Sequence, residues 1–408
     1  MLMMSNDKKL TPQLRFKEFK NSGEWEEKKL GEISSIVKEK LGKNNYTLLS
    51  ITAGHGLVSQ LEKFGKEIAG SSYENYIVIH KNDFAYNKSA TKDYQSGYVA
   101  LLQTYDVAAV PNSIFLCFRV DETILNVFFL EQLFKFNYHD KYLRKLIQIG
   151  ARAHGSLNIS NKDFFSMPIP IPPLKEQQKI ADFLSSVDEL IMLEKIKLEK
   201  LKEYKKGLLQ NLFPKENQKV PDLRFSDFKN SGDWEEKKLG DIVDILDNLR
   251  QPIAKYKRVQ GRYPYYGANG IMDYINNYIF DGTYLLIGED GSVINKNNSP
   301  VMHIATGKFW VNNHTHVVQE KNKLYNLFFI YYTLHNADIE GFVKGIPPKL
   351  NQENLRQLSV MTTNIEEQRK IANFMLLVDE LIIEQIKTIE MLQEYKKGLL
   401  QQVFVNKF

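Results

Sequence analysis

The sequence predicts an α+β protein in which two mixed α/β bodies are separated by two long helices. The helices are expected to pair as an antiparallel coiled coil, in a pseudo-two-fold, circular arrangement. Three observations support this prediction. The chain has 408 residues, more than one hydrophobic core usually holds, so two or more domains are expected. It contains two internal repeats, and short β-rich runs such as 76–79, 110–120 and 283–287 lie between them.

The first repeat joins residues 12–33 to residues 221–242. These segments read PQLRFKEFKNSGEWEEKKLGEI and PDLRFSDFKNSGDWEEKKLGDI, with 17 of 22 positions identical at an offset of 209. Each copy holds one tryptophan, Trp25 or Trp234. We expect both to be core residues where a body meets a helix, with contact to a partner protein as the alternative.

The second repeat joins residues 176–213 to residues 367–404 at an offset of 191. The first half therefore carries 18 more residues between the repeats than the second, and the intervening segments show no convincing sequence likeness. Gene duplication with drift is an alternative explanation for this pattern. Uniform drift, however, would not leave nearly identical segments beside dissimilar ones, so we expect the two bodies to bind different targets.

The repeats divide the chain into a first body (1–170), a first helix (171–214), a second body (215–360) and a second helix (361–408). Apolar residues in both helices recur at a three-four spacing, which is typical of a coiled-coil seam. Pairing of the two helices within the chain explains two matched seams better than oligomerisation does. The predicted seam residues are Leu184, Val187, Ile191, Leu198, Leu201, Leu208, Val378, Ile382, Ile389, Leu392 and Leu399.

Polar residues interrupt each seam at equivalent positions: Glu194 and Lys205 in the first helix, Gln385 and Lys396 in the second. A polar seam residue costs stability but disfavours wrong registers. Two halves of the same polarity are related naturally by a two-fold axis perpendicular to the helices, which makes the helices antiparallel. This pairing would bring Glu194 near Lys396.

Composition restricts the class of protein only broadly. A net charge of +5 favours an anionic partner without identifying it. The single cysteine, Cys117, excludes an internal disulfide, and no Cys/His group has the spacing of a zinc site. Residues 1–10 are polar, and no run approaches the ~18 apolar residues of a membrane span, so we expect a cytoplasmic protein.

An enzyme is the main alternative class. The sequence holds no glycine-rich AdoMet or nucleotide loop, no phosphate loop, no Asn/Asp-Pro-Pro-aromatic tetrad and no acidic nuclease cluster with lysine. We therefore expect no catalytic residue, metal site or cofactor site in this chain. Two alternatives stay open: a nuclease site assembled from scattered acids, and a scaffold whose two bodies bind only protein partners.

The stretch IPIPPLKEQQKIADFLSSVDELI (169–191), the repeated tryptophan segments and the duplicated helices together resemble the specificity subunits of type I restriction-modification systems. The likeness extends over nearly the whole chain. The second half departs from it by entering its helix through VMTTNIEEQ (360–368), without the prolines of the first half. The resemblance implies that each body is a target recognition domain that reads one half of a bipartite, asymmetric DNA site.

The resemblance also implies partners. Two modification (methyltransferase) subunits would dock on the helices and the flanks of the bodies, with restriction (motor-nuclease) subunits outside them. AdoMet, ATP and magnesium would be bound by those partners. Helices of about 40 residues span about 60 Å at ~1.5 Å per residue, so they would set a spacer of roughly one DNA turn between the half-sites.

In the second body, side chains suited to phosphates and base edges gather in three stretches. Residues 250–266 combine cations with tyrosines, although a solvated surface strand would look the same. Residues 285–293 place carboxylates that could accept from cytosine or simply form a hairpin turn. Residues 305–318 add amides and two histidines, which without a third ligand make no metal site. The predicted DNA-binding residues are Arg250, Lys257, Arg258, Arg262, Tyr265, Tyr266, Glu289, Asp290, Thr306, Lys308, Asn312, Asn313 and His314.

In the first body, the polar loop FAYNKSATKD (84–93) follows an apolar strand and is the first candidate for DNA contact. Residues 141–156 are the second candidate. Their helical part is expected to pack on one face, which leaves the glycine-flanked end for DNA. The predicted DNA-binding residues are Tyr86, Asn87, Lys88, Ser89, Lys92, Arg152 and His154.

Overall fold

The computed structural model describes residues 10–52, 54–68, 73–147, 157–291, 293–296 and 298–405. The chain divides into two compact units. Unit 1 comprises Met1–Glu194 and Thr388–Phe408, and unit 2 comprises Lys195–Lys387. Each unit takes in one body and parts of both long helices, so the predicted segment boundaries at 170, 214 and 360 fall near helix ends and not between compact units.

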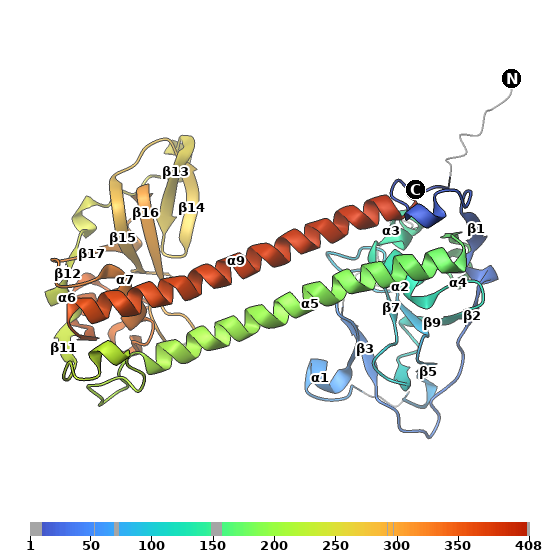
Figure 1. The fold of residues 1–408 in the computed structure, drawn as a ribbon, viewed down its shortest axis with the longest axis horizontal. Coiled ribbons are helices and arrows are strands. Elements are labelled where there is room, and N and C mark those ends of the chain that lie inside the picture. The colour runs from blue at the N-terminus through green and yellow to red at the C-terminus, as the bar shows by residue number, and fades with distance from the viewer. Residues whose placement is uncertain are drawn as a thin grey trace. The chain divides into compact units, whose positions relative to one another are not determined.

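Unit 1 is built around a four-stranded antiparallel sheet in the order β2-β9-β6-β7 (Figure 1). The pairs β1–β10, β3–β4 and β5–β8 lie outside this sheet. The rings of Phe84 and Phe118 stack 5.1 Å apart in its core. In chain order the elements are β1 (Glu26–Lys29), β2 (Ser34–Ile36), β3 (Leu49–Thr52), β4 (Gly56–Ser59), α1 (Gln60–Phe64), β5 (Ile77–His80), β6 (Phe84–Asn87), β7 (Tyr98–Leu101), β8 (Val107–Val110), β9 (Phe115–Val120), α2 (Val127–Lys135), α3 (Tyr138–Leu143), α4 (Asn161–Phe165) and β10 (Pro168–Ile171).

Unit 2 is built around a six-stranded sheet in the order β12-β17-β15-β16-β13-β14 (Figure 1). Its strands pair antiparallel except for β13 and β16, which are parallel. A separate pair, β11–β18, lies beside the helices. In chain order the elements are β11 (Glu235–Lys238), α6 (Leu239–Ile242), β12 (Val243–Ile245), the short 3-10 helix η5 (Asp247–Leu249), β13 (Gln260–Gly267), β14 (Gly270–Ile275), β15 (Phe280–Gly288), β16 (Met302–Val311), β17 (Thr315–Glu320), α7 (Leu327–Leu334), α8 (Gln352–Gln357) and β18 (Ser359–Thr362).

The two units share one arrangement of four strands, called the frame below, that is not evident from their sequences. The strand orders β2-β9-β6-β7 and β12-β17-β15-β16 correspond one to one, and each set is antiparallel throughout. The two bodies, which show no convincing sequence likeness, therefore have the same basic fold. Their differences lie in what is added to the frame. Unit 1 adds β3, β4, β5 and β8, whereas unit 2 adds the β13–β14 hairpin.

A helix with the same start covers each frame. Asn126 caps α2 and Asn326 caps α7, each accepting a hydrogen bond from the third backbone N–H of its helix. The backbone N–H of each asparagine donates to a long-helix glutamine, Gln177 or Gln368. The segments NVFFL and NLFFI therefore form a third repeat, too short to detect by comparing the chain with itself.

Each copy of the tryptophan repeat is fastened to the start of a long helix by a buried ion pair. Arg15 donates two hydrogen bonds of 2.7 Å to the Glu176 carboxylate, and Arg224 donates two of 2.8 Å to Glu367. These four side chains are at most 7% exposed. The repeated tryptophans are buried, as predicted for core residues.

The long helices α5 (Leu174–Asn211) and α9 (Ile365–Val403) pack antiparallel within each unit (Figure 1). In unit 1 the N-terminal part of α5 shares a core with the C-terminal part of α9, and in unit 2 the ends are exchanged. The predicted antiparallel coiled coil is thus confirmed. No helix among the described residues is long and apolar enough to cross a membrane. Of the predicted seam residues, Leu184, Val187, Ile191, Leu208, Val378, Ile389 and Leu399 are buried, and Leu198, Leu201, Ile382 and Leu392 are half-buried.

The lysines of the seam pair with different carboxylates from the one predicted. Lys396 binds Asp188 in unit 1, and Lys205 binds Asp379 in unit 2, at equivalent positions of the repeat. The predicted approach of Lys396 to Glu194 is replaced by the contact with Asp188, because a long lysine stem can leave the apolar seam and reach a carboxylate at its edge. Burial lowers the pKa of Lys396, and the carboxylate opposes that shift.

Candidate nucleic-acid interface

The predicted recognition loops of the two bodies lie at the same point of the shared frame. After β6, the carbonyl oxygen of Lys88 accepts a hydrogen bond of 2.8 Å from the Leu157 N–H. After β15, the carbonyl oxygen of Glu289 accepts one of 2.8 Å from the Leu350 N–H. The strand pairings give Lys88 and Glu289 equivalent positions. Two loops of unlike sequence are therefore structural counterparts.

In unit 1 the structure corrects one candidate at this strand end. Tyr86 is fully buried, stacks on Phe164 with ring centroids 4.4 Å apart, and donates its hydroxyl to the Ser96 carbonyl at 2.8 Å. It is a core residue and not a DNA contact in this conformation. The reason is that Tyr86 belongs to β6 itself and its side chain faces the core, whereas the loop begins after the strand.

The residues that follow Tyr86 form the loop. The Asn87 side-chain oxygen accepts a hydrogen bond of 3.0 Å from the Ser89 N–H, which closes a turn. Lys88 is half-buried, and its Nζ donates to the Asn161 side chain at 3.0 Å. Burial lowers the pKa of Lys88. Lys92 is exposed and is the most accessible of the loop candidates. The last two predicted residues, Arg152 and His154, lie outside the described part of the chain.

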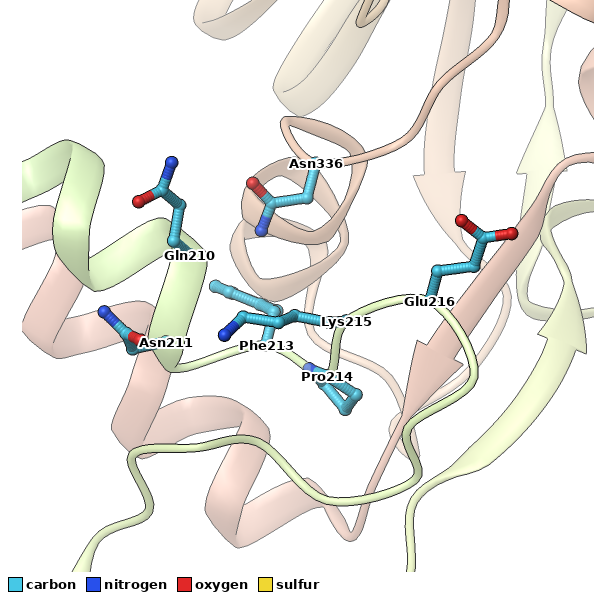
Figure 2. A pocket seen from close by; sticks show the side chains of 7 residues that line it. All are labelled: Gln210, Asn211, Phe213, Pro214, Lys215, Glu216 and Asn336. Carbon is cyan, nitrogen blue, oxygen red and sulfur yellow. The ribbon is translucent and has the colours of Figure 1, made fainter.

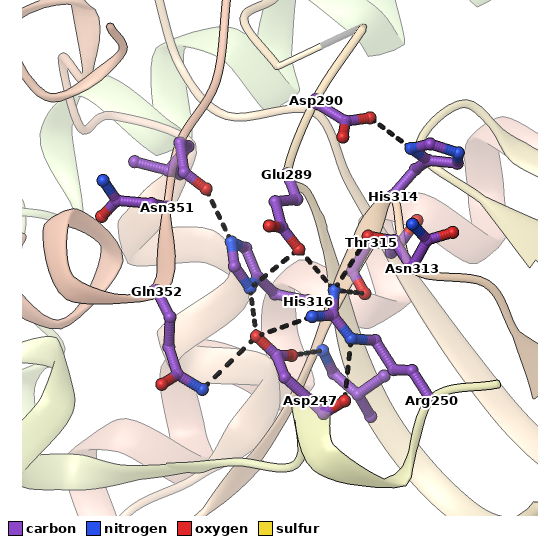
Figure 3. A network of polar contacts seen from close by, with 12 residues as sticks. Asp247, Arg250, Glu289, Asp290, Asn313, His314, Thr315, His316, Asn351 and Gln352 are labelled. Carbon is purple, nitrogen blue, oxygen red and sulfur yellow. Dashed lines mark hydrogen bonds and ion pairs between the residues drawn. The ribbon is translucent and has the colours of Figure 1, made fainter. Parts of the chain in front are cut away.

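Arg250 is the centre of a polar network in unit 2, where η5, the end of β15 and the start of β17 meet (Figure 3). Its guanidinium donates to Glu289 Oε2 at 2.5 Å and to the Thr315 carbonyl at 3.0 Å, and lies 3.4 Å from Asp247 Oδ2. The side chains of Arg250 and Glu289 are 13% and 11% exposed. Both were predicted to contact DNA. The structure corrects this, because each buried charge is occupied by the other.

His316 extends the network and brings three potential metal ligands together. Its Nδ1 lies 2.6 Å from Asp247 Oδ2, and its Nε2 lies 2.7 Å from the Leu350 carbonyl oxygen. Ligand atoms of Asp247, Glu289 and His316 lie within 4.8 Å of one another, so these residues could hold a cation. The Arg250 guanidinium contacts both carboxylates and supplies the positive charge there. This arrangement favours an ion-pair network over a metal site.

Glu289 is held ionised in this network. Burial would raise the pKa of Glu289, but hydrogen bonds from Arg250 and Lys349 outweigh burial and hold it below its ordinary value. The same contact raises the pKa of Lys349. Each oxygen of the Glu289 carboxylate is therefore paired with a cation of the protein.

The turn between β16 and β17 adjoins the network. His314 Nδ1 lies 2.5 Å from Asp290 Oδ1, and these side chains are 50% and 27% exposed. Asn312 is buried, and its side-chain oxygen accepts from the His314 N–H at 2.9 Å, so it supports the turn instead of reading DNA as predicted. Asn313 is exposed. Asp290, Asn313 and His314 are the surface candidates at this strand end.

Near the turn of the β13–β14 hairpin, two residues predicted to contact DNA are engaged in packing. Tyr265 is buried, and the Arg258 guanidinium lies 4.4 Å from the centre of its ring. Arg258 also donates to the Ile253 carbonyl at 3.0 Å. Both residues stabilise the hairpin, because a tyrosine face attracts a guanidinium. Tyr266 is half-buried and packs edge-on against Phe309.

Two exposed cations, Arg262 and Lys308, lie beside half-buried tyrosines. Arg262 lies 5.0 Å from the centre of the Tyr263 ring, and Lys308 lies 4.5 Å from that of Tyr278. The two tyrosine rings are 5.1 Å apart. Cations beside aromatic faces suit phosphates and unstacked bases. Tyr278 was not predicted, because it lies in a separate segment that only the fold brings to Tyr263. Two further predicted residues, Lys257 and Thr306, are exposed.

Sequence reasoning also missed the exposed segment 344–349, which lies beside the network. Lys349 Nζ is 3.0 Å from Glu289 Oε1. A signal for this segment exists. A Leu-Asn pair stands shortly before α4, at Leu157, and directly before α8, at Leu350. The pair marks 344–349 as the counterpart of the segment that holds Arg152 and His154.

A hollow near the end of α5 is a poor candidate for DNA recognition (Figure 2). Its lining combines carboxamides with Phe213 and Pro214, and its lysine, Lys215, pairs with Asp222. Asn336 donates its amide to the Leu209 carbonyl at 2.5 Å. These contacts join the end of α5 and the residues after it to the second tryptophan repeat and to the segment after α7, so the hollow marks a junction.

The chain matches the family model described as type I restriction modification DNA specificity domain over residues 22–203 and 231–392. It is 39% identical over 140 residues to a Haemophilus influenzae protein provisionally named type I restriction enzyme specificity subunit S.HindORF215P. It is 26% identical over 269 residues to one of Methanocaldococcus jannaschii, provisionally named type I restriction enzyme MjaX specificity subunit. These matches cover 34% and 64% of this chain, and 36% and 63% of the relatives.

A solved structure agrees with the fold over nearly the whole chain. The crystal structure of the S subunit of a type I restriction-modification system from M. genitalium has a TM-score of 0.62 to this chain. The alignment covers 98% of this chain and 100% of that one, at 16% identity. At this identity the likeness concerns the fold alone.

Proposed function

Because the chain belongs to the type I restriction modification DNA specificity domain family, we propose that it is the DNA-recognition subunit of a type I restriction-modification complex. Each body would read one half of a bipartite, asymmetric site, and the chain itself would be non-catalytic. One observation carries this proposal: the same frame occurs twice with unlike loops at the same strand end.

The contrast between frame and loops supports two different half-sites. Base edges are read by side chains whose identity determines the bases accepted, whereas the frame only positions them. The loop after β6 offers Asn87, Lys88 and Lys92, while the turns after β15 and β16 offer Asp290 and His314. Loops with such different donors and acceptors would select different bases.

We propose that α5 and α9 set the spacer between the half-sites. A helix of 38 or 39 residues is about 57 Å long at ~1.5 Å per residue. Paired rods of fixed length would restrict the spacing at which both bodies reach DNA. Lengthening both helices by a whole number of heptads should therefore lengthen the spacer of the recognised site.

The repeated surface supports two identical partners. Leu190 and its equivalent Leu381 are about half exposed on the helices, and so are Tyr204 and its equivalent Tyr395. Exposed apolar side chains repeated in both halves fit a partner that docks twice. We propose two modification subunits as that partner, with restriction subunits bound outside them. AdoMet, ATP and magnesium would be bound by these partners, and a cytoplasmic location stays a prediction.

The decisive experiment is to map methylation directed by this chain. Co-expressed with its modification subunits in a host without adenine methylation, it should direct methylation to one bipartite motif. Replacing residues 34–165 by the corresponding body of a relative should change only one half of that motif. A matched control carries the same replacement in the second body. Methylation without any motif, or a motif unchanged by either exchange, would contradict the proposal.

A further inference from the structure

The hairpin 344–349 of unit 2 reads Lys-Gly-Ile-Pro-Pro-Lys, and all six residues are exposed. The N–H groups of Lys344 and Lys349 each donate to the carbonyl of the other at 2.9 Å, which closes the turn. Near its tip the Ile346 side chain is fully exposed to solvent. An aliphatic side chain in this position contributes no burial energy to the fold, so it is available for contact with another molecule.

The base of this hairpin is fixed to the polar network around Glu289. Lys349 forms a backbone bridge with Asp290, and its Nζ lies 3.0 Å from Glu289 Oε1. Leu350 donates its N–H to the Glu289 carbonyl at 2.8 Å, and its own carbonyl oxygen lies 2.7 Å from His316 Nε2. The tip is thus held beside the loop that follows β15. A turn held in this way loses little conformational entropy when it binds.

The hairpin belongs to the part of the chain that differs between the two halves. The six residues before Leu350 read KGIPPK, whereas the six before Leu157 read ARAHGS. A protein partner that docks twice would need the same surface twice. The two halves of an asymmetric DNA site, in contrast, require different contacts. A turn particular to one unit therefore fits DNA better than a shared protein partner.

We propose that this hairpin is a further DNA-contacting element of unit 2, in which Ile346 contacts bases in a groove and Lys344 faces a phosphate. This inference rests on the proposed function. Apolar side chains contact the thymine methyl group or wedge between base steps. A lysine at the backbone adds affinity that is independent of sequence and sensitive to salt. Lys349, tied to Glu289, positions the turn.

The test compares variants of the full chain assembled with its modification subunits. A preferred duplex is first selected from random DNA with the wild-type assembly, and affinity is then measured for that duplex and for a scrambled one over a range of salt. Ile346→Ser should weaken binding to the preferred duplex by about tenfold, the scale of one base contact, and leave the scrambled duplex and the salt dependence unchanged. Lys344→Ala should weaken both duplexes equally and reduce the salt slope by about 0.9, the value for one phosphate.

Matched controls come from an exposed segment of the same unit. Leu324→Ser and Lys323→Ala remove an exposed leucine and an exposed lysine that lie before α7. They should change neither affinity nor preference. Wild-type affinity of Ile346→Ser for both duplexes would overturn this inference. Loss of the modification subunits from that variant, with DNA preference intact, would identify a protein contact and overturn it too. A wild-type assembly without any preferred duplex would contradict the proposed function itself.

Discussion

At the scale of single residues, the two buried arginine–glutamate pairs are the clearest case of one contact used twice. In unit 2, Arg224 is held by two oxygens of Glu367 and also donates to the Gly232 carbonyl at 2.7 Å. Removal of one partner from a buried pair leaves an uncompensated charge. Arg224→Ala should therefore lower the free energy of unfolding of unit 2 by about 3–5 kcal/mol.

Denaturant unfolding followed by tryptophan fluorescence measures that loss. The matched control is Lys237→Ala, which breaks an ion pair with Glu235 on the surface and should cost less than about 1 kcal/mol. Equal losses for the two variants would show that the Arg224 pair is not a buried anchor.

Residue types predicted the candidate site in part. The polar loop after β6 was located from sequence, because an apolar run followed by Asn, Lys and Ser predicts a strand end. Tyr86 and Tyr265 were misplaced, because tyrosine serves equally well in a core and on a surface. Arg250 and Glu289 were misplaced because they lie 39 positions apart, and only the fold makes them partners.

At the scale of elements, the seam of α5 and α9 includes a lysine–aspartate contact in each unit. Asp188→Lys should place two cations together at Lys396 and lower the melting temperature of unit 1. Exchanging both charges, as Asp188→Lys with Lys396→Asp, should restore most of the loss, because the pair is then re-formed in reverse. Glu194→Lys with Lys396→Glu is the comparison. Rescue by the Glu194–Lys396 exchange, and not by the Asp188–Lys396 exchange, would support the pairing of Lys396 with Glu194 that the sequence predicts.

A histidine at the end of α7 makes unit 2 sensitive to acid. Burial beside Tyr331 and Tyr332, together with the charge of Lys205, lowers the pKa of His335 from 6.5 to about 4. Between pH 4 and pH 6.5 the unfolded chain binds a proton at this histidine that the folded unit does not. The contribution of neutral His335 to the free energy of unfolding is therefore complete above pH 6.5 and declines as the pH falls toward 4.

Melting temperatures measured from pH 7.5 to pH 4.5 test this effect. His335→Gln should flatten the decline. His55→Gln, which removes an exposed histidine, should leave it unchanged. An identical decline in wild type and His335→Gln would contradict the assignment.

The helices and strands were not equally predictable. The three-four spacing of apolar residues predicted both helices, because helix contacts repeat locally along the chain. Their antiparallel pairing followed from the repeat, because a two-fold axis relates two halves of the same polarity. The shared order of four strands was not predicted. Strand pairing joins distant segments, and the two bodies bury different side chains on the same frame. The repeated cap residues Asn126 and Asn326 are a local sign of that frame.

At the scale of the whole molecule, each tryptophan repeat forms the same backbone hydrogen bond with the C-terminal end of a long helix. The Leu14 N–H donates to the Gln402 carbonyl at 2.9 Å in unit 1, as the Leu223 N–H donates to the Asn211 carbonyl at 2.8 Å in unit 2. A permutant that joins Phe408 to Met1 and opens the chain at Lys215 should therefore fold and direct methylation to the same motif. An unfolded or inactive permutant, with a linker-only insertion at Lys215 still active, would contradict this layout.

The two lysine–aspartate contacts have a further consequence. The helix α9 carries both Asp379 and Lys396, so it contains both partners of the contact that it makes with α5. A fragment of residues 216–408 is therefore its own complement, and two copies should assemble as a symmetric homodimer held by two reciprocal contacts. Light scattering would measure its mass. Such a dimer would contain the second body twice, so the DNA site that it recognises should be a palindrome.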